Sequence, residues 1–405
     1  MQGQEMRLSF NDEVTRAIAV VRGHMVRKHP YFREREREVE VSMGGGGGHG
    51  LCLTTSLLLV ICSLPAMVES ACGRNPVVFN FGDSNSDTGG FVAGLGNQIS
   101  LPEGRVFFHR PAGRYCDGRL IVDFLCESLK TNYLSPYLES LGSDFRNGAN
   151  FAIAGSRTLP PDVPFSLHIQ VNQFLHFKSR SLELDARGPI DEEGFRKALY
   201  AIDIGQNDLS AAFDANLPYN QVIQRIPFVI LEIKTAVKTL YDNGGKNFWI
   251  HNTGPLGCLP VKLSLPRKDD SSLDQCGCLM PVNNAAKEFN AQLSALCDEL
   301  RSELKDATIV YTDIFTIKYD IIANHTTYGF ESSLMACCGY GGPPYNFNLN
   351  ITCGNPGCPV CPEGSKYVSW DGVHYAEAAN AIVASKILTA EYSKPKVKFD
   401  YFCFA

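Results

Sequence analysis

The chain has 405 residues and a formal net charge of −6, with 44% hydrophobic and 20% charged residues. These proportions are ordinary for a globular protein and supply ample apolar material for a large core. The near-neutral, slightly acidic balance argues against the clustered positive charge on which nucleic-acid binding depends, so no nucleic-acid partner is expected.

Residues 1–49 are predicted to be a disordered extension. Charges alternate from Arg33 to Glu40, and a glycine run follows at Gly44–Gly48. Neither segment can bury enough apolar surface to offset the entropy lost on folding.

The apolar segment over residues 50–70 predicts a signal peptide. It is uncharged up to residue 68, Pro65 interrupts it, and small residues favour cleavage after Ser70. One alternative is an uncleaved membrane anchor, because the uncharged stretch nearly reaches the roughly 20 residues that span a bilayer. Another is a start at Met43, which would place residues 1–42 outside the protein.

From Ala71 onward, short apolar runs alternate with amphipathic segments. The runs bounded by polar residues or glycine are predicted strands: Val77–Phe81, Leu199–Ile204, Phe248–Ile250 and Thr308–Tyr311. Three- and four-residue apolar spacing, or alanine enrichment, predicts helices over 223–240, 282–304 and 376–390. This alternation predicts a single α/β domain over residues 71–405, with a parallel sheet covered on both faces and chemistry at the carboxyl ends of its strands.

Ser84 is the first candidate for chemistry. It lies in the sequence Phe81-Gly82-Asp83-Ser84, directly after a predicted strand and beside a glycine that permits a turn. A lone Gly-Asp-Ser is also common in turns without any chemistry, so other residues have to support this candidate.

Two further strand ends carry groups suited to binding an oxyanion. Gly155 ends the stretch that begins at Asn147, and a glycine there can offer an unobstructed backbone N–H. Asn207, within Gly205-Gln206-Asn207-Asp208, could aim its amide at a developing negative charge. The alternative for this second motif is an Asx-type turn that closes the strand.

A final loop places Asp371 three residues before His374, with Gly372 between them. A serine nucleophile needs a base, and the base needs a partner that fixes its tautomer. Asp-x-x-His can supply both from one tight turn. The alternative is a solvated loop before the last helix.

The 15 cysteines favour an oxidising compartment. The cysteines from Cys276 to Cys361 are expected to form disulfides that tie the long loop over 328–369 to the body of the protein. If Cys52 and Cys62 are removed with a signal peptide, an odd number remains, and the spacing does not give the connectivity.

A zinc site is the alternative for part of this cluster. It would use a Cys-x-Cys pair and a Cys-x-x-Cys pair: Cys276, Cys278, Cys358 and Cys361. The first pair is spaced more tightly than in the usual zinc knuckle, which favours disulfides.

Taken in order, these motifs resemble the plant GDSL-type esterases and lipases of the SGNH hydrolase superfamily, over roughly residues 75–388. The matching blocks are Phe81–Ser84, Asn150–Gly155, Gly205–Asp208 and Asp371–His374. Two positions depart from the familiar pattern: Asn85 stands where the motif has leucine, and Tyr375 follows the histidine. The nucleophile also lacks Gly-x-Ser-x-Gly, which argues against the α/β-hydrolase fold.

The resemblance implies a fold and a mechanism. The fold would be a flavodoxin-like three-layer α/β/α sandwich around a five-stranded parallel sheet. Ser84 would be the nucleophile, His374 its base and Asp371 the partner of the base. The N–H groups of Ser84 and Gly155 and the amide of Asn207 would form the oxyanion hole. No metal or organic cofactor would be required.

The expected substrate is a small-molecule or carbohydrate ester, with acetyl or another short acyl group favoured. The alternatives are a lipase acting on longer chains, an acyltransferase, and a non-catalytic binding protein on the same fold. The mature chain is expected to be secreted to the extracellular space, with the cell wall and vacuole as further possibilities, and to have no stable membrane span. Glycosylation is expected at the sequons of Asn324 and Asn350.

Overall fold

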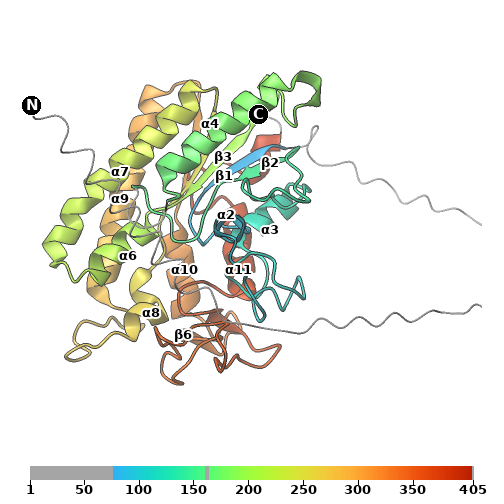
Figure 1. Ribbon diagram of the computed structural model, residues 1–405. Helices are drawn as coiled ribbons and strands as arrows, with labels where there is room; N and C mark the ends of the chain where they lie inside the picture. The colour runs from blue at the N-terminus through green and yellow to red at the C-terminus, as the bar shows by residue number, and fades with distance from the viewer. Residues whose placement is uncertain (1–75, 160–163, 404–405) are drawn as a thin grey trace, which may run out of the picture. The chain divides into compact units, whose positions relative to one another are not determined.

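The computed structural model describes residues 76–159 and 164–403 (Figure 1). The predicted extension over 1–49 and the predicted signal peptide over 50–70 lie outside the described residues. All described residues belong to one compact unit, Met67–Ala405.

A six-stranded sheet forms the centre of this unit, in the order β2-β1-β3-β4-β5-β8. The first five strands are parallel, as predicted, and β8 adds a short antiparallel edge. The strands are β1 (Val78–Gly82), β2 (Gly148–Asn150), β3 (Leu199–Asp203), β4 (Asn247–His251), β5 (Thr308–Thr312) and β8 (Ser393–Lys394). Every residue of β1 and β4 is buried, which explains why these strands appear in the sequence as apolar runs rather than as alternating patterns.

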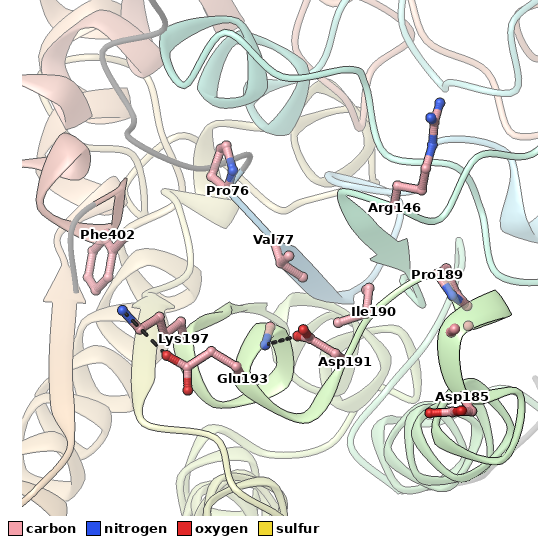
Figure 2. A pocket seen from close by; sticks show the side chains of 13 residues that line it. Pro76, Val77, Arg146, Asp185, Pro189, Ile190, Asp191, Glu193, Lys197 and Phe402 are labelled. Carbon is pink, nitrogen blue, oxygen red and sulfur yellow. Dashed lines mark hydrogen bonds and ion pairs between the residues drawn. The ribbon is translucent and has the colours of Figure 1, made fainter.

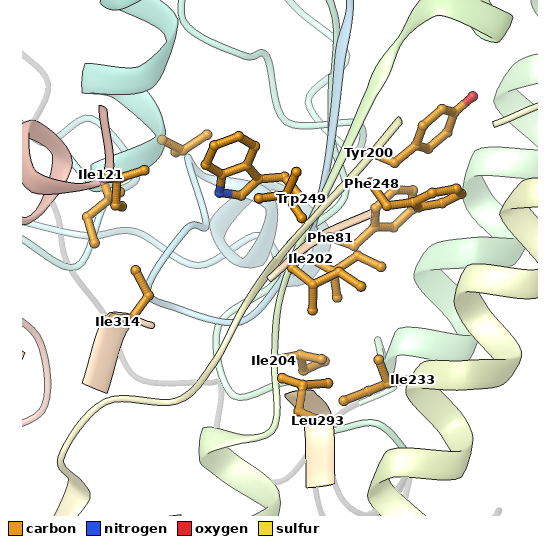
Figure 3. Packing of buried hydrophobic residues seen from close by; sticks show 14 of the residues in the cluster. Phe81, Ile121, Tyr200, Ile202, Ile204, Ile233, Phe248, Trp249, Leu293 and Ile314 are labelled. Atoms are coloured by element: carbon orange, nitrogen blue, oxygen red, sulfur yellow. The ribbon is translucent and has the colours of Figure 1, made fainter. Parts of the chain in front are cut away.

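Helices cover both faces of the sheet and complete the three layers (Figure 1). The helices are α2 (Gly90–Leu95), α3 (Ile121–Ser128), α4 (Leu167–Glu183), α5 (Glu192–Lys197), α6 (Gln206–Asp214), α7 (Tyr219–Asp242), α8 (Pro260–Leu263), α9 (Met280–Glu303), α10 (Ile314–Ala323) and α11 (Glu377–Leu388). Short 3₁₀ turns occur at Asp185–Arg187, Leu256–Cys258 and Phe399–Cys403. In Figure 3, Trp249 lies on the side of Ile121 from α3, whereas Tyr200 and Phe248 lie on the other face with Ile233 from α7.

The three predicted helices, two from apolar spacing and one from alanine enrichment, correspond to α7, α9 and α11, so these predictions are confirmed. None of the helices within the described ranges is long and apolar enough to cross a membrane.

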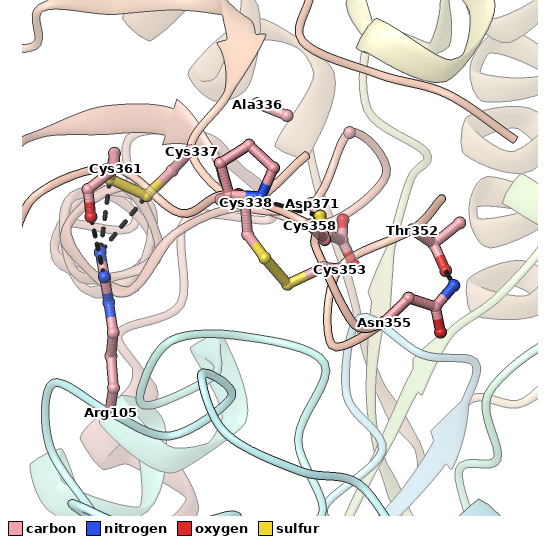
Figure 4. The surroundings of a disulfide bond; sticks show 12 residues. Arg105, Ala336, Cys337, Cys338, Thr352, Cys353, Asn355, Cys358, Cys361 and Asp371 are labelled. Carbon is pink, nitrogen blue, oxygen red and sulfur yellow. Dashed lines mark hydrogen bonds between the residues drawn. A yellow bond between two sulfur atoms is a disulfide. The ribbon is translucent and has the colours of Figure 1, made fainter. Parts of the chain in front are cut away.

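The cysteine prediction is partly wrong. The disulfides are Cys258–Cys278, Cys337–Cys361 and Cys338–Cys353. The last two close the region over 328–369 on itself instead of tying it to the body, and Figure 4 shows them side by side. The first and last parts of that region pair as two short strands, β6 (Ser332–Ala336) and β7 (Tyr367–Ser369).

The zinc alternative is also excluded by these bonds, because Cys278 and Cys361 are each paired with a cysteine outside the predicted ligand set. Cys276 and Cys358 carry free thiols. Arg105 makes one of the contacts to the rest of the protein: its guanidinium donates to the Cys361 carbonyl at 2.9 Å (Figure 4). The same guanidinium lies 5.2 Å from the ring centre of Trp370.

Candidate active site

The carboxyl ends of three neighbouring strands bring the first candidate residues together. β1 pairs with β2 on one side and with β3 on the other. Ser84 therefore follows the central strand of the three, Gly155 lies beyond β2, and Asn207 opens the helix after β3. Because parallel strands end at the same edge of a sheet, these residues share one edge of the fold.

The backbone around Ser84 is held by side chains close to it in the sequence and across the sheet. The Asp83 carboxylate accepts from the Asn85 N–H at 2.9 Å, and the Asn150 amide donates to the Ser86 carbonyl at 2.7 Å. Gly82 leaves room for this close approach, since a Cβ there would lie 2.4 Å from the carbonyl oxygen of Asp203. Only 6% of Ser84 is exposed.

His374 and Asp371 form a hydrogen-bonded pair. The Nδ1 of His374 lies 2.6 Å from one carboxylate oxygen of Asp371, and the other oxygen accepts from the N–H groups of His374 and Val373 at 2.7 and 2.9 Å. Gly372 permits this turn with a φ of 95°. With Nδ1 bonded to the carboxylate, Nε2 is the ring nitrogen left for a reacting group.

Burial and charge act in opposite directions on this pair. Burial alone would raise the pKa of Asp371, but the charge of His374 and the hydrogen bonds outweigh it and hold that pKa below its usual value. Burial alone would lower the pKa of His374, but the charge and hydrogen bond of Asp371 outweigh it and raise that pKa. The site therefore stabilises an imidazolium beside a carboxylate.

The backbone N–H groups of Ser84 and Gly155 donate to no acceptor within the described part of the chain. The Asn207 amide donates one hydrogen to the Ser156 carbonyl at 3.0 Å, which leaves its second hydrogen available. Asp87 holds the Gly155 turn next to Ser84, because its carboxylate accepts from the Ala154 N–H at 2.8 Å. Three donors thus remain available at the strand ends.

The structure does not show a hydrogen bond between Ser84 and His374. Within the described residues, the buried Nε2 of His374 has no partner. Catalytic hydrogen bonds are often long in ligand-free enzymes and tighten when substrate binds. The aromatic ring of Tyr115 lies 5.5 Å from the imidazole, centre to centre, and flanks the base.

Several residues that support this site were not singled out in the sequence. Asn150 lies inside a matching block and Asp87 lies three residues after Ser84, so their place near the motifs could have identified them. Asp208 accepts from the N–H and hydroxyl of Thr158, and burial raises its pKa to about 6. Gln170, which bonds both the N–H and the carbonyl of Gly82, comes from the first turn of α4 and gives no signal in the sequence.

Cavities differ at the two ends of the sheet. A hollow of about 440 Å³ lies at the amino end of β1, lined by Val77, Asp191 and the ion pair of Glu193 with Lys197 (Figure 2). At the carboxyl end, a space of about 10 Å³ borders Asn85, which follows Ser84, and a second of about 20 Å³ lies between α3 and the sheet. An open hollow of about 490 Å³ is lined by Phe347, whose ring packs against Gly372 in the loop of the base. The candidate catalytic groups therefore have tight packing on the side of Asn85 and an open hollow on the side of Phe347.

Comparison with known proteins gives consistent matches. The sequence model of a family described as GDSL-like Lipase/Acylhydrolase matches residues 78–387. The chain is 59% identical over 355 residues to GDSL esterase/lipase LIP-4 of Arabidopsis thaliana, covering 86% of this chain and 94% of that one. It is 45% identical over 336 residues to Alpha-L-fucosidase 3 of the same plant, covering 77% and 90%.

A solved structure of an acetylxylan esterase from Geobacillus stearothermophilus also matches. Its identity is 13%, its TM-score is 0.36, and the match covers 78% of this chain and 94% of that one.

Proposed function

This chain belongs to the GDSL-like lipase/acylhydrolase family and is a carboxylic ester hydrolase, and from that premise we propose that Ser84, His374 and Asp371 are its catalytic triad. The observation that carries the proposal is the 2.6 Å contact between His374 and Asp371, which directs Nε2 of the ring away from the carboxylate. A serine at the end of β1 and a base fixed in this tautomer are what acyl transfer requires.

In the proposed reaction, Nε2 of His374 accepts the hydroxyl proton of Ser84 as the oxygen attacks the ester carbonyl. The bond to the alcohol breaks as the imidazolium returns its proton to the leaving oxygen. Water, deprotonated by the same nitrogen, then releases the acid from the acyl-enzyme. Asp371 stabilises the imidazolium in both steps.

The negative charge that develops on the carbonyl oxygen needs fixed donors. The N–H groups of Ser84 and Gly155 and the free amide hydrogen of Asn207 are the proposed oxyanion hole. Donors held in place before the reaction require no reorganisation during it, and each is typically worth about 100- to 1,000-fold in rate.

Short acyl groups are the proposed substrates. The space beside Asn85, of about 10 Å³, matches the room needed for roughly one water molecule or methyl group. A long chain entering this space would have to displace core side chains such as Leu256, which is 1% exposed. Acetyl esters of carbohydrates or specialised metabolites therefore fit better than long-chain lipids.

Two other reactions remain as test outcomes. An acyltransferase would share the acyl-enzyme but would pass the acyl group to an alcohol. A glycosidase, as the name of one relative describes, would need two carboxyl groups flanking a glycosidic bond instead of a serine with its base.

The remaining proposals concern location. We propose that the protein is secreted after cleavage behind Ser70 and glycosylated at Asn324 and Asn350, both of which are exposed. N-terminal sequencing of secreted protein and a mass shift on deglycosylation test this, and an intact residue 1–70 segment would contradict cleavage.

The function is tested by measuring acid release from acetylated xylan, glycoside acetates and triglycerides, and fucose release from a fucoside, with wild type, Ser84→Ala and Ser86→Ala. The Ser86 hydroxyl makes no hydrogen bond and serves as a matched control two residues away. We expect acetate release by wild type and Ser86→Ala, and its loss in Ser84→Ala. Retention of more than a few per cent of activity in Ser84→Ala would require another nucleophile.

A further inference from the structure

Lys318 is a buried cation that the proposed reaction does not use. It lies on α10, is 7% exposed, and its ammonium lies 4.4 Å from the ring centre of Tyr375. Within the described residues, no oxygen accepts a hydrogen bond from it and no carboxylate lies within ion-pair distance. Burying an ammonium without such partners is costly, so its position calls for an explanation.

The location of Lys318 connects the two halves of the candidate site. It borders the 10 Å³ space together with Asn85, which follows Ser84, and with Val373 and Tyr375, which flank His374. Its side chain also passes close to Gly254, where a Cβ would lie 2.9 Å from the Cδ of Lys318. The ammonium therefore lies between the nucleophile turn and the loop of the base.

Two carboxylates beneath the nucleophile turn account for a cation at this place. Asp83 is fully buried and one of its oxygens has no hydrogen-bond partner. Asp203 ends β3 next to it and lies 3.8 Å from the imidazole of His251. Burial lowers the pKa of Lys318, and the charges of Asp203 and Asp83 act against this and favour the ammonium. Burial and the charge of Asp203 together raise the pKa of Asp83 to about 7, as expected for neighbouring buried acids.

We propose that Lys318 is a positioning residue of this ester hydrolase: its buried ammonium compensates Asp83 and Asp203 beneath the nucleophile turn and opposes protonation of His374. The inference rests on the proposed function, because it assigns His374 as the base. It extends that function by placing a charge outside the triad in control of the base.

The titratable groups that face His374 come from four parts of the fold: Asp371 from its own loop, Asp83 from the turn after β1, Glu103 and Tyr115 from the segment before α3, and Lys318 from α10. Asp371 and Asp83 favour the imidazolium, and Lys318 disfavours it. Glu103 favours it as well, because the charge of His374 acts to lower the pKa of Glu103. Removing the charge of Lys318 must therefore raise the pKa of His374. Since the base must be neutral to accept a proton, the acid limb of kcat/KM moves to higher pH.

The test is the pH dependence of kcat/KM for p-nitrophenyl acetate with wild type, Lys318→Met and Lys318→Arg. We expect Lys318→Met to move the acid limb upward by about 1 to 2 pH units, the size that Coulomb's law gives for a charge about 6 to 12 Å away at an effective dielectric constant near 20. Lys318→Arg keeps the charge and should restore the wild-type limb. A purely structural lysine would change the amplitude of the profile but not its midpoint.

Lys262 provides the matched control. It is also buried, at 2% exposed, but its ammonium pairs with Asp214. Lys262→Met should lower Tm without moving the acid limb. An unmoved limb in folded Lys318→Met would overturn the inference, while loss of activity in Ser84→Ala would still support the proposed function.

Folding is checked by circular dichroism and thermal unfolding of every variant. If Lys318→Met does not fold, Lys318→Gln makes the same charge change with a polar end in the cavity. Failure of both neutral variants to fold, with Lys318→Arg folded and active, would support the compensation of Asp83 and Asp203. A folded Lys318→Gln with a wild-type profile would contradict the proposal.

Discussion

Replacing Asp371 with asparagine should separate the position of His374 from its protonation. One oxygen of Asp371 accepts two backbone N–H bonds at 2.7 and 2.9 Å, and the other meets Nδ1 of His374 at 2.6 Å. An asparagine oxygen can keep the two backbone bonds, which turns its NH₂ group toward Nδ1. The ring then has to carry its proton on Nε2, where it cannot accept one from Ser84.

This wrong tautomer should lower kcat by about 10⁴-fold, as the same change does in serine proteases. That loss corresponds to about 5.5 kcal/mol of transition-state stabilisation. Steady-state hydrolysis of p-nitrophenyl acetate measures it, and KM should change little because the carboxylate does not touch the ester. If Asp371→Asn kept more than a tenth of wild-type kcat in a folded protein, Asp371 would not fix the tautomer of the base.

Three further predictions use other parts of the structure. Asn207→Ala should lower kcat about 100- to 1,000-fold with a small change in KM, because it removes a donor needed only in the transition state. A rise in KM as large as the fall expected in kcat would indicate that Asn207 binds the substrate in the ground state instead. Glu103→Gln should raise Tm at pH 8 but not at pH 4. Burial raises the pKa of Glu103 to about 7, so its ionisation opposes folding as the pH rises from about 4.5 to 7. Equal Tm changes at both pH values would refute this. Reduction of Cys337–Cys361 and Cys338–Cys353 should lower activity before the far-ultraviolet circular dichroism changes, because these bonds restrict the region that leads into Asp371. Simultaneous loss of activity and of the circular dichroism signal would refute this prediction.

The central layer of the fold was predictable because burial leaves a direct trace in the sequence. Strands covered on both faces have to be apolar throughout, and β1, β3, β4 and β5 were found from that property within one or two residues. The edge strand β8 has two residues, Ser393 and Lys394, and no such trace. Among the helices, α4 was not predicted, because its buried apolar positions are interrupted by polar ones, including the buried Gln170.

The disulfide pattern was not predictable for a different reason. Which cysteines meet depends on how the chain folds back, and spacing alone does not determine it. Cys337 and Cys338 are adjacent in sequence, yet they bond to partners 24 and 15 residues away. Pairing β6 with β7 at the two ends of the region brings these partners together, and that pairing depends on contacts far apart in sequence.

The residues of the candidate site also differ in how far the sequence alone could place them. Ser84, Gly155 and Asn207 follow strands, so an ordinary rule about parallel sheets was enough to place them at one edge. Lys318 lies in the middle of an apolar helix, where a lysine usually extends to solvent, and only the fold brings it within electrostatic reach of Asp83 and Asp203. A positive charge that compensates buried carboxylates at a site can thus lie on a helix that carries no recognisable sequence motif. If Lys318 influences the protonation of His374, variants at this one helix position should shift the pKa of the base while leaving every residue of the triad unchanged.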